Sequence, residues 1–235
     1  MPETEGVIFP ALAVFLVAYN NGLNRWPPFH GRLYVPLNLL LTAAVTVGAL
    51  TVGGLDRGDA GLGPGQAGGA AAGLALGAAA SIPLFLALRS SRAAAAVADG
   101  RFAGVGRVGL LYRALVRIPL GTALAEELIF RGVLFGLLAP GGRLQAALWS
   151  SLVFGLWHIA PAYNRMEENG RIAGAGRYAV VLRIAAAVAA TGAAGMAFCW
   201  LRVAAGGIAA PLVLHATVNS LGMIAAHLAN RRPDA

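Results

Sequence analysis

The chain has 235 residues, of which 58% are hydrophobic and only 12% are charged, and its mean hydropathy is +0.69. A soluble domain would carry about twice that share of charge, so the composition favours a polytopic membrane protein. The net charge of +8 comes from arginines spread between apolar runs, which is unlike the basic face of a nucleic-acid-binding protein. The single cysteine, Cys199, excludes an intramolecular disulfide and a multi-cysteine zinc site.

Apolar runs of about 20 residues are what a bilayer crossing requires. We predict an all-α transmembrane helix bundle of about seven helices, six to eight, forming one membrane-embedded domain over residues 1–235. The first and fifth runs are short for a full crossing. The expected spans are residues 7–20, 33–53, 67–88, 118–139, 144–160, 178–201 and 207–229.

The connections between these runs differ in character. Residues 53–65 are rich in Gly, Pro and Asp and predict a loop, and the Pro-Gly-Gly at 140–142 predicts a tight turn that makes the fourth and fifth helices neighbours. Residues 89–117 are rich in arginine and place Val105, Val108, Leu111 and Leu115 three or four positions apart. That spacing predicts an amphipathic interfacial helix.

The arginines of the connections predict the orientation of the bundle. Thirteen fall on one side of the expected topology and three on the other. Because positive residues mark the cytoplasmic side, we expect a multi-pass protein of the cell membrane with its N-terminus outside and its C-terminus in the cytoplasm.

Three charged residues interrupt the fourth run: Glu126, Glu127 and Arg131. Each would cost about 2.5 to 3.5 kcal/mol at the centre of a membrane helix unless it is paired or functional. Glu127 and Arg131 are four residues apart and can form an ion pair that braces the helix. Glu126 lies about 100° around the helix and has no local partner, which favours a functional role.

Two histidines are expected at a compatible depth, His158 near the inner end of the fifth run and His215 near the middle of the seventh. Each shares a helix face with a residue four positions away, Phe154 with His158 and Asn219 with His215. A single intramembrane histidine is more often a hydrogen-bonded core residue, and an interhelical hydrogen bond would explain Asn219 equally well. Together with Glu126, the histidines favour a site between helices.

A carboxylate that faces two imidazoles supports two hydrolytic mechanisms. In one, Glu126 is a general base that takes a proton from water, while His158 and His215 position the water or stabilise an oxyanion. In the other, Glu126, His158 and His215 bind one zinc ion whose water is the nucleophile. The spacing leaves the choice between no cofactor and one zinc ion open.

The order of these residues, Glu126-Glu127-x-x-x-Arg131, then Phe154-x-x-x-His158, then His215-x-x-x-Asn219, resembles the CPBP family of CAAX proteases and bacteriocin-processing enzymes, also called Abi. The resemblance covers residues 118–229, which are the expected catalytic helices. Residues 1–117, outside the resemblance, are expected to form the leading helices and the Arg-rich cytoplasmic segment.

The resemblance implies an intramembrane endopeptidase that acts near the cytoplasmic face, where eukaryotic members remove the last three residues of prenylated CAAX proteins. Its substrate would be a peptide or membrane protein that can carry a lipid, surrounded by membrane lipids, with no nucleic acid involved. It also implies roles for residues: Glu126 activates water, His158 assists it, His215 and Asn219 serve the oxyanion, Glu127 and Arg131 brace the helix, and Phe154 shapes the site.

Two other functions are compatible with the same polar cluster. A non-catalytic scaffold or immunity protein that binds a membrane partner could keep the cluster as structure. A transporter with a carboxylate proton relay would need a pathway to the outer side, and the outer halves of the expected spans carry no acidic residue. We therefore expect the endopeptidase, with the scaffold as the alternative.

Overall fold

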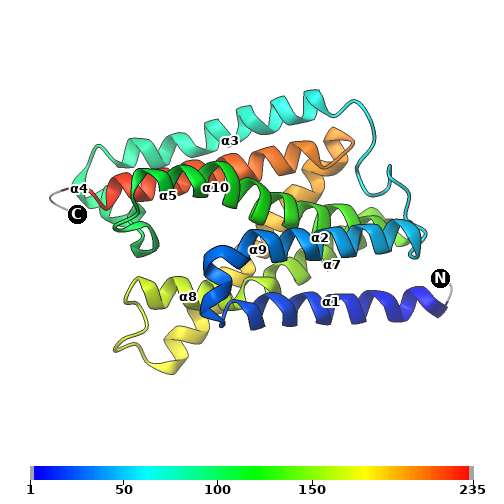
Figure 1. The fold of residues 1–235 in the computed structure, drawn as a ribbon, viewed down its shortest axis with the longest axis horizontal. Helices are drawn as coiled ribbons and strands as arrows, with labels where there is room; N and C mark the ends of the chain where they lie inside the picture. Colours follow the sequence, from blue (N-terminus) through cyan, green and yellow to red (C-terminus); the bar gives the residue numbers. More distant parts are fainter. Residues whose placement is uncertain (1–2, 233–235) are drawn as a thin grey trace.

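The computed structural model describes residues 3–232, with side chains from Phe9 onward, and every regular element in that part of the chain is helical. Three long helices come first: α1 (Glu3–Leu23), α2 (Tyr34–Thr51), which follows the π-helical turn η1 (Phe29–Leu33), and α3 (Ala67–Ala87). They run along the long axis of the molecule (Figure 1). The segment between α2 and α3 is irregular, as its Gly and Pro content predicts. The all-α class is confirmed.

The fourth predicted helix is the middle of a longer helical segment that changes its winding. It begins with α5 (Arg107–Tyr112) and continues through the π-helical stretches η3 (Arg113–Leu124) and η4 (Glu127–Leu134) to α6 (Phe135–Leu138). Long π-helical stretches are rare, and π turns inside helices are frequent at functional sites. Glu126 stands at the junction of the two stretches. The tight turn η5 (Ala139–Gly141) then leads into α7.

Residues 89–117, the Arg-rich segment, contain the predicted apolar helix face only from Arg107 onward. They form α4 (Ser91–Val97), the 3-10 turn η2 (Gly100–Phe102) and the start of the central helical segment at Arg107. Gly104 interrupts the chain with φ +72°, a value that favours glycine. The apolar positions downstream of this break do share an exposed face, which comprises Val108, Leu111 and Leu115.

The remaining chain forms α7 (Arg143–Trp157), α8 (Ile159–Glu168), α9 (Arg177–Ala205) and α10 (Ala209–Ala229). The predicted fifth span, 144–160, is wrong at its end, because α7 stops at Trp157 and a separate helix begins two residues later. One reason is Pro161, which has no N–H and so interrupts the helical hydrogen bonds across this point. The site described below contains this break.

Four helical segments are long and apolar enough to cross a membrane: Phe29–Thr51, Ala67–Ala87, Arg177–Ala205 and Ala209–Ala229. Their most apolar windows are only 11% to 33% buried, so large apolar side chains such as Leu40, Leu74 and Val181 face outward. Outward apolar faces of this length suit a lipid environment. The chain is a multi-pass membrane protein, and crossings by α1, the central helical segment and α7 remain predictions.

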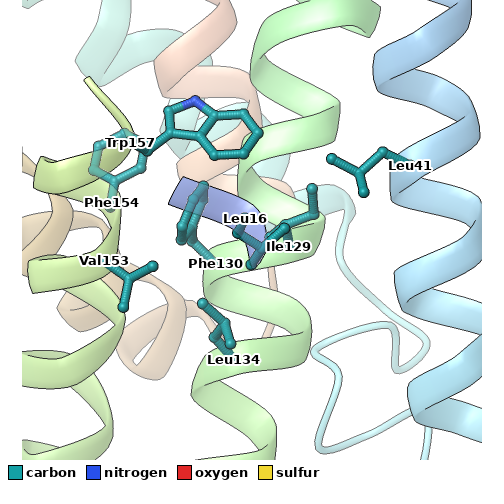
Figure 2. Packing of buried hydrophobic residues seen from close by; sticks show 8 residues of the cluster. All are labelled: Leu16, Leu41, Ile129, Phe130, Leu134, Val153, Phe154 and Trp157. Carbon is teal, nitrogen blue, oxygen red and sulfur yellow. The ribbon is translucent and has the colours of Figure 1, made fainter. Parts of the chain in front are cut away.

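The tightest packing surrounds the central helical segment. Ile129, Phe130 and Leu134 of this segment are 0% exposed. Figure 2 shows them between side chains of α7 on one side and Leu41 of α2 on the other, with Leu16 of α1 beside Phe130. The other members of this cluster are Leu16, Leu41, Val153, Phe154 and Trp157. The first two helices thus contribute directly to the core that holds the acidic segment.

A stripe of glycines on α3 allows close contact with α10. A Cβ atom at Gly73 would overlap the carbonyl oxygen of Ala210, and one at Gly77 would lie 2.7 Å from Cβ of Thr217. At Gly69 the nearest atom, Cβ of Ala205, would lie at an ordinary 3.5 Å. Small residues at such crossings let helix backbones approach in membranes. The stripe therefore lets α3 and α10 pack closely.

This geometry predicts opposite effects for two alanine substitutions on the same face of α3. Gly73→Ala is expected to destabilise the protein by about 1 to 3 kcal/mol, because the backbone of α10 must move away. Gly69→Ala is expected to be neutral or to stabilise by about 0.5 to 1 kcal/mol, because alanine costs less entropy in a helix. Thermal unfolding of both variants in one detergent measures the difference, and equal midpoints would contradict the close approach.

A buried aspartate ties together three segments at one end of the bundle. Asp99, 3% exposed, pairs with Arg101 at 2.7 Å and with Arg165 of α8 at 3.1 Å. Its side chain also accepts a hydrogen bond from Asn169 at 3.1 Å, and its backbone exchanges two hydrogen bonds with the Asn230 amide at 2.7 and 3.2 Å. Asp99 therefore links the α4–α5 connection to α8 and to the end of α10.

The pKa of Asp99 predicts how this link responds to acid. Burial raises the pKa, but the hydrogen bonds and charge of Arg101 and the hydrogen bond of Asn169 outweigh it and lower the pKa to about 2. The stabilising contribution is present above the ordinary pKa of 3.8 and is lost as the pH falls toward 2. Asp99→Asn is expected to cost about 1 to 2 kcal/mol at pH 7, allowing for the exposed arginines. The difference in melting temperature between wild type and variant should become smaller as the pH is lowered from 7 to 3. A difference that stays constant would contradict this.

Candidate active site

Glu126 and two histidines meet at one point inside the bundle. Oε2 of Glu126 lies 3.9 Å from Nε2 of His158, at the end of α7, and 3.8 Å from Nε2 of His215 on α10. Glu126 and His215 are 5% and 6% exposed, whereas His158 has a 21% exposed side chain. Three segments far apart in the sequence thus bring one carboxylate oxygen and two imidazole nitrogens together, as their depths in the bundle predict.

The neighbouring glutamate has a different set of partners. Oε1 of Glu127 lies 3.2 Å from Nη1 of Arg131, so the predicted ion pair is present. The same oxygen lies 2.8 Å from Nδ1 of His215. Glu127 and Arg131 are both 0% exposed. His215 therefore stands between the two glutamates, a contact that spacing along the chain could not predict.

Arg131 is enclosed by aromatic rings as well as by Glu127. Its guanidinium carbon lies 4.1 Å from the ring centre of Phe154 on α7, 5.2 Å from that of Phe198 on α9 and 5.9 Å from that of Phe130. A cation over an aromatic face is stabilised by about 2 kcal/mol or more when it is desolvated. Phe154 also packs edge-on against His158 at 4.6 Å. Arg131 thus packs against Phe154, and Phe154 in turn packs against His158.

Each histidine is held through Nδ1. Nδ1 of His158 lies 2.7 Å from the carbonyl oxygen of Phe154, and a carbonyl can only accept, so Nδ1 carries the proton. Nδ1 of His215 faces the Glu127 carboxylate, which likewise accepts from N–H. When a ring held in this way is neutral, its Nε2 has a lone pair on the side of Glu126; when it is protonated, Nε2 donates instead.

Trp157 is a member of the site that the sequence analysis missed. Its Nε1 donates to Oε1 of Glu126 at 3.3 Å, which leaves Oε2 on the side of the histidines. The signal available in the sequence was its position directly before His158, because a buried tryptophan N–H usually finds a partner. Phe198, which packs 5.3 Å from the ring of His215, carried no comparable signal.

Asn219 is the one expected site residue that the structure does not join to this cluster. It is exposed on α10, one turn beyond His215. Among the described residues it has no hydrogen-bond partner within the cluster, so its part in an oxyanion site remains a prediction.

The donor atoms have the chemistry of a zinc site but not its spacing. Two imidazole nitrogens and a carboxylate oxygen are typical catalytic zinc ligands, and at metal distances of about 2.0 to 2.1 Å tetrahedral ligands lie about 3.3 Å apart. The oxygen–nitrogen distances here are 3.8 and 3.9 Å. No group of three or more His, Cys, Asp or Glu side chains in the described part of the chain could hold a metal ion. The arrangement as it stands does not fit zinc.

Long outward-facing apolar helices around a buried cluster of glutamates and histidines define a multi-pass membrane protein with an internal polar site. The family model described as type II CAAX prenyl endopeptidase Rce1-like matches residues 109–221, so this part of the chain is similar to that family. The match includes every expected site residue from Glu126 to Asn219 and confirms the resemblance. Comparison with curated proteins and with solved structures gave no match.

This family match supports a membrane protease (hydrolase) with a peptide or protein as its substrate class. Helices α1, α2 and α3 lie outside the matched segment. They nevertheless contribute to the packing of the central helical segment and of α10. Their role is therefore structural support at the least, and the site depends on contacts from both parts of the chain.

Proposed function

We propose that the protein is an intramembrane endopeptidase in which Glu126 activates water. The observation that carries the proposal is the convergence of Glu126 Oε2 with two imidazole Nε2 atoms at 3.8 and 3.9 Å. These distances are too long for direct hydrogen bonds, and a water that bridges the three atoms is part of the proposal. Oε2 is buried and has no hydrogen-bond partner among the described residues, which supports a water in that place.

The proposed reaction begins with water held between Glu126 and His158. One water proton passes to Oε2 of Glu126, and Nε2 of His158 accepts the second hydrogen as a hydrogen bond and so orients the water. The oxygen attacks the carbonyl carbon of the scissile peptide. Glu126 then returns its proton to the leaving nitrogen as the carbon–nitrogen bond breaks, so that proton and charge balance.

The oxyanion of the intermediate needs donors on the other side of the site. We assign this role to His215, which in its protonated form donates from Nε2, and to the amide of Asn219 one turn further along α10. Glu127 holds His215 through Nδ1 at 2.8 Å and is itself held by Arg131. These two residues position the donor and make no contact with the substrate in this proposal.

The same proposal includes an orientation and a substrate. Six arginines fall in three connections, residues 89–106, 169–176 and 230–232, which lie at one end of the bundle (Figure 1). Arg143 and Arg202 instead line a pocket with Gly58 and Asp59. The arginine-rich end is expected to be cytoplasmic. The active site would open toward this side and cleave lipidated, CAAX-like peptides.

The test is cleavage of a fluorogenic, lipidated CAAX-like peptide by detergent-purified protein, with and without a zinc chelator. Wild type is expected to cleave the peptide, Glu126→Gln to be inactive, and the chelator to have no effect. Activity that the chelator removes would overturn the metal-free mechanism while keeping the endopeptidase. Equal rates for wild type and Glu126→Gln would contradict catalysis on this substrate class and favour a scaffold that binds a membrane partner.

A further inference from the structure

We propose that Asn20 and Asn21 on α1 are positioning residues for His158. Their side chains form hydrogen bonds with the backbone groups that are left unpaired at the helix break where this histidine lies. Both asparagines are outside the segment that matches the family model. The inference rests on the proposed function only where it assigns His158 a part in orienting water. The structural consequence for the His158 ring can be tested without any substrate.

The amide of Asn21 occupies the place of one helical hydrogen bond. In an uninterrupted helix the N–H of Ala160 would donate to the carbonyl of Leu156, four residues earlier. Instead, Ala160 N–H donates to Oδ1 of Asn21 at 2.6 Å, and Nδ2 of Asn21 donates to the Leu156 carbonyl at 3.0 Å. A side chain more than 130 positions away in sequence thus bridges both ends of the broken bond.

Asn20 satisfies the next carbonyl. The helical partner of the Trp157 carbonyl would be the N–H of Pro161, which does not exist. Nδ2 of Asn20 donates to this carbonyl at 2.7 Å. Nδ2 of Asn24 in turn donates to Oδ1 of Asn20 at 2.9 Å, which fixes the orientation of the Asn20 amide. A buried carbonyl left without a donor would cost about 1 to 3 kcal/mol, so these asparagines make the break stable.

The break decides which group reaches the carbonyl of Phe154. Because the backbone at His158 has φ −93° and ψ 9°, its N–H donates to Gly155, three residues earlier, at 3.0 Å. The Phe154 carbonyl is then available to the His158 ring, whose Nδ1 lies 2.7 Å away. If the helix continued through this point, the backbone N–H of His158 would take the same carbonyl. The ring would then share this acceptor with a backbone N–H, and the contact that selects its tautomer would be weaker.

Nitrogen-15 NMR of histidine side chains tests this step on the full-length protein in detergent. The chain has only four histidines, and the signal missing from a His158→Gln sample identifies His158. Wild type is expected to show the Nδ1–H tautomer at this position. Asn21→Leu and Asn20→Ala are expected to show mixed tautomers.

Asn164→Ala is the matched control, because Asn164 also joins α8 to α1, through the Asn24 carbonyl at 2.8 Å, but away from the break. It should leave the tautomer unchanged. A folded Asn21→Leu protein with the wild-type tautomer would overturn the proposal. If Asn21→Leu does not fold, Asn21→Asp retains the acceptor for Ala160 and lacks the donor for Leu156, and an unchanged tautomer there would overturn the proposal equally.

Peptide cleavage separates this inference from the proposed function. If both are right, Asn21→Leu lowers kcat by about 10²-fold through misplacement of His158 and leaves KM unchanged. A tautomer change in a protein whose wild type cleaves no peptide would retain the positioning role and reject the endopeptidase. Loss of cleavage with an unchanged tautomer would reject the positioning role and retain the endopeptidase.

Discussion

Glu126→Gln is expected to lower kcat for peptide cleavage by about 10²- to 10⁴-fold, the usual contribution of a general base, with little change in thermal stability. Glutamine has the same shape, and its oxygen can still accept the hydrogen bond from Trp157 that Oε1 accepts at 3.3 Å. It cannot take a proton from water. The measurement is the steady-state rate on a lipidated peptide together with the melting temperature of the same preparation.

A matched control for this substitution is Glu167→Gln, because Glu167 is exposed on α8. This variant makes the same Glu-to-Gln replacement at an exposed position away from the site. It should leave kcat within about twofold of wild type, as expected for surface changes. A Glu126→Gln enzyme that retains more than a tenth of the wild-type rate would contradict the role of this carboxylate as the base.

Arg131→Met is expected to have the largest effect on stability. The substitution leaves Glu127, which is 0% exposed, without its cation, and breaking a buried ion pair from one side costs about 3 to 5 kcal/mol. The cation contact with Phe154 at 4.1 Å is lost as well. In a protein of this size the melting temperature should fall by about 6 to 20 °C.

Two further variants separate pairing from other effects of Arg131→Met. In the double variant Glu127→Gln with Arg131→Met no unpaired charge remains, so at least half of the lost stability should return. Arg183→Met removes an arginine that is exposed on α9 and should change stability by about 0.5 kcal/mol or less. A double variant as unstable as Arg131→Met would show that the pair is not the cause.

Length and apolarity were sufficient to predict the segments that contain α2, α3, α9 and α10, because each has an 18-residue window of high mean hydropathy with at most two charged residues. Length and apolarity did not predict the backbone conformation where contacts with other helices determine it. The only local sign that the helix stops at Trp157 is Pro161, just beyond the predicted run. The amide that replaces the helical hydrogen bond of Ala160 belongs to Asn21. In the Arg-rich segment the predicted apolar spacing starts at Val105, and the helix that carries it begins at Arg107, after the break at Gly104.

The site was predictable in part for a similar reason. Charged residues inside an apolar run are conspicuous in the sequence. The spacing of four between Glu127 and Arg131 predicted their ion pair. The contact of His215 with Glu127 depends on how α10 lies against the central helical segment, which periodicity within one helix cannot give. The same limit applies to Trp157, whose bond to Glu126 joins two helices.

The enclosed guanidinium of Arg131 also has a consequence for how the chain enters the membrane during synthesis. When residues 107–138 leave the ribosome, neither Phe154 nor Phe198 exists yet, and His215 follows Glu127 by 88 residues. Until then the segment carries three charged groups whose insertion into lipid is unfavourable. Its release from the translocon should therefore wait for α7, α9 and α10, so that this segment enters the bilayer as part of a group of helices.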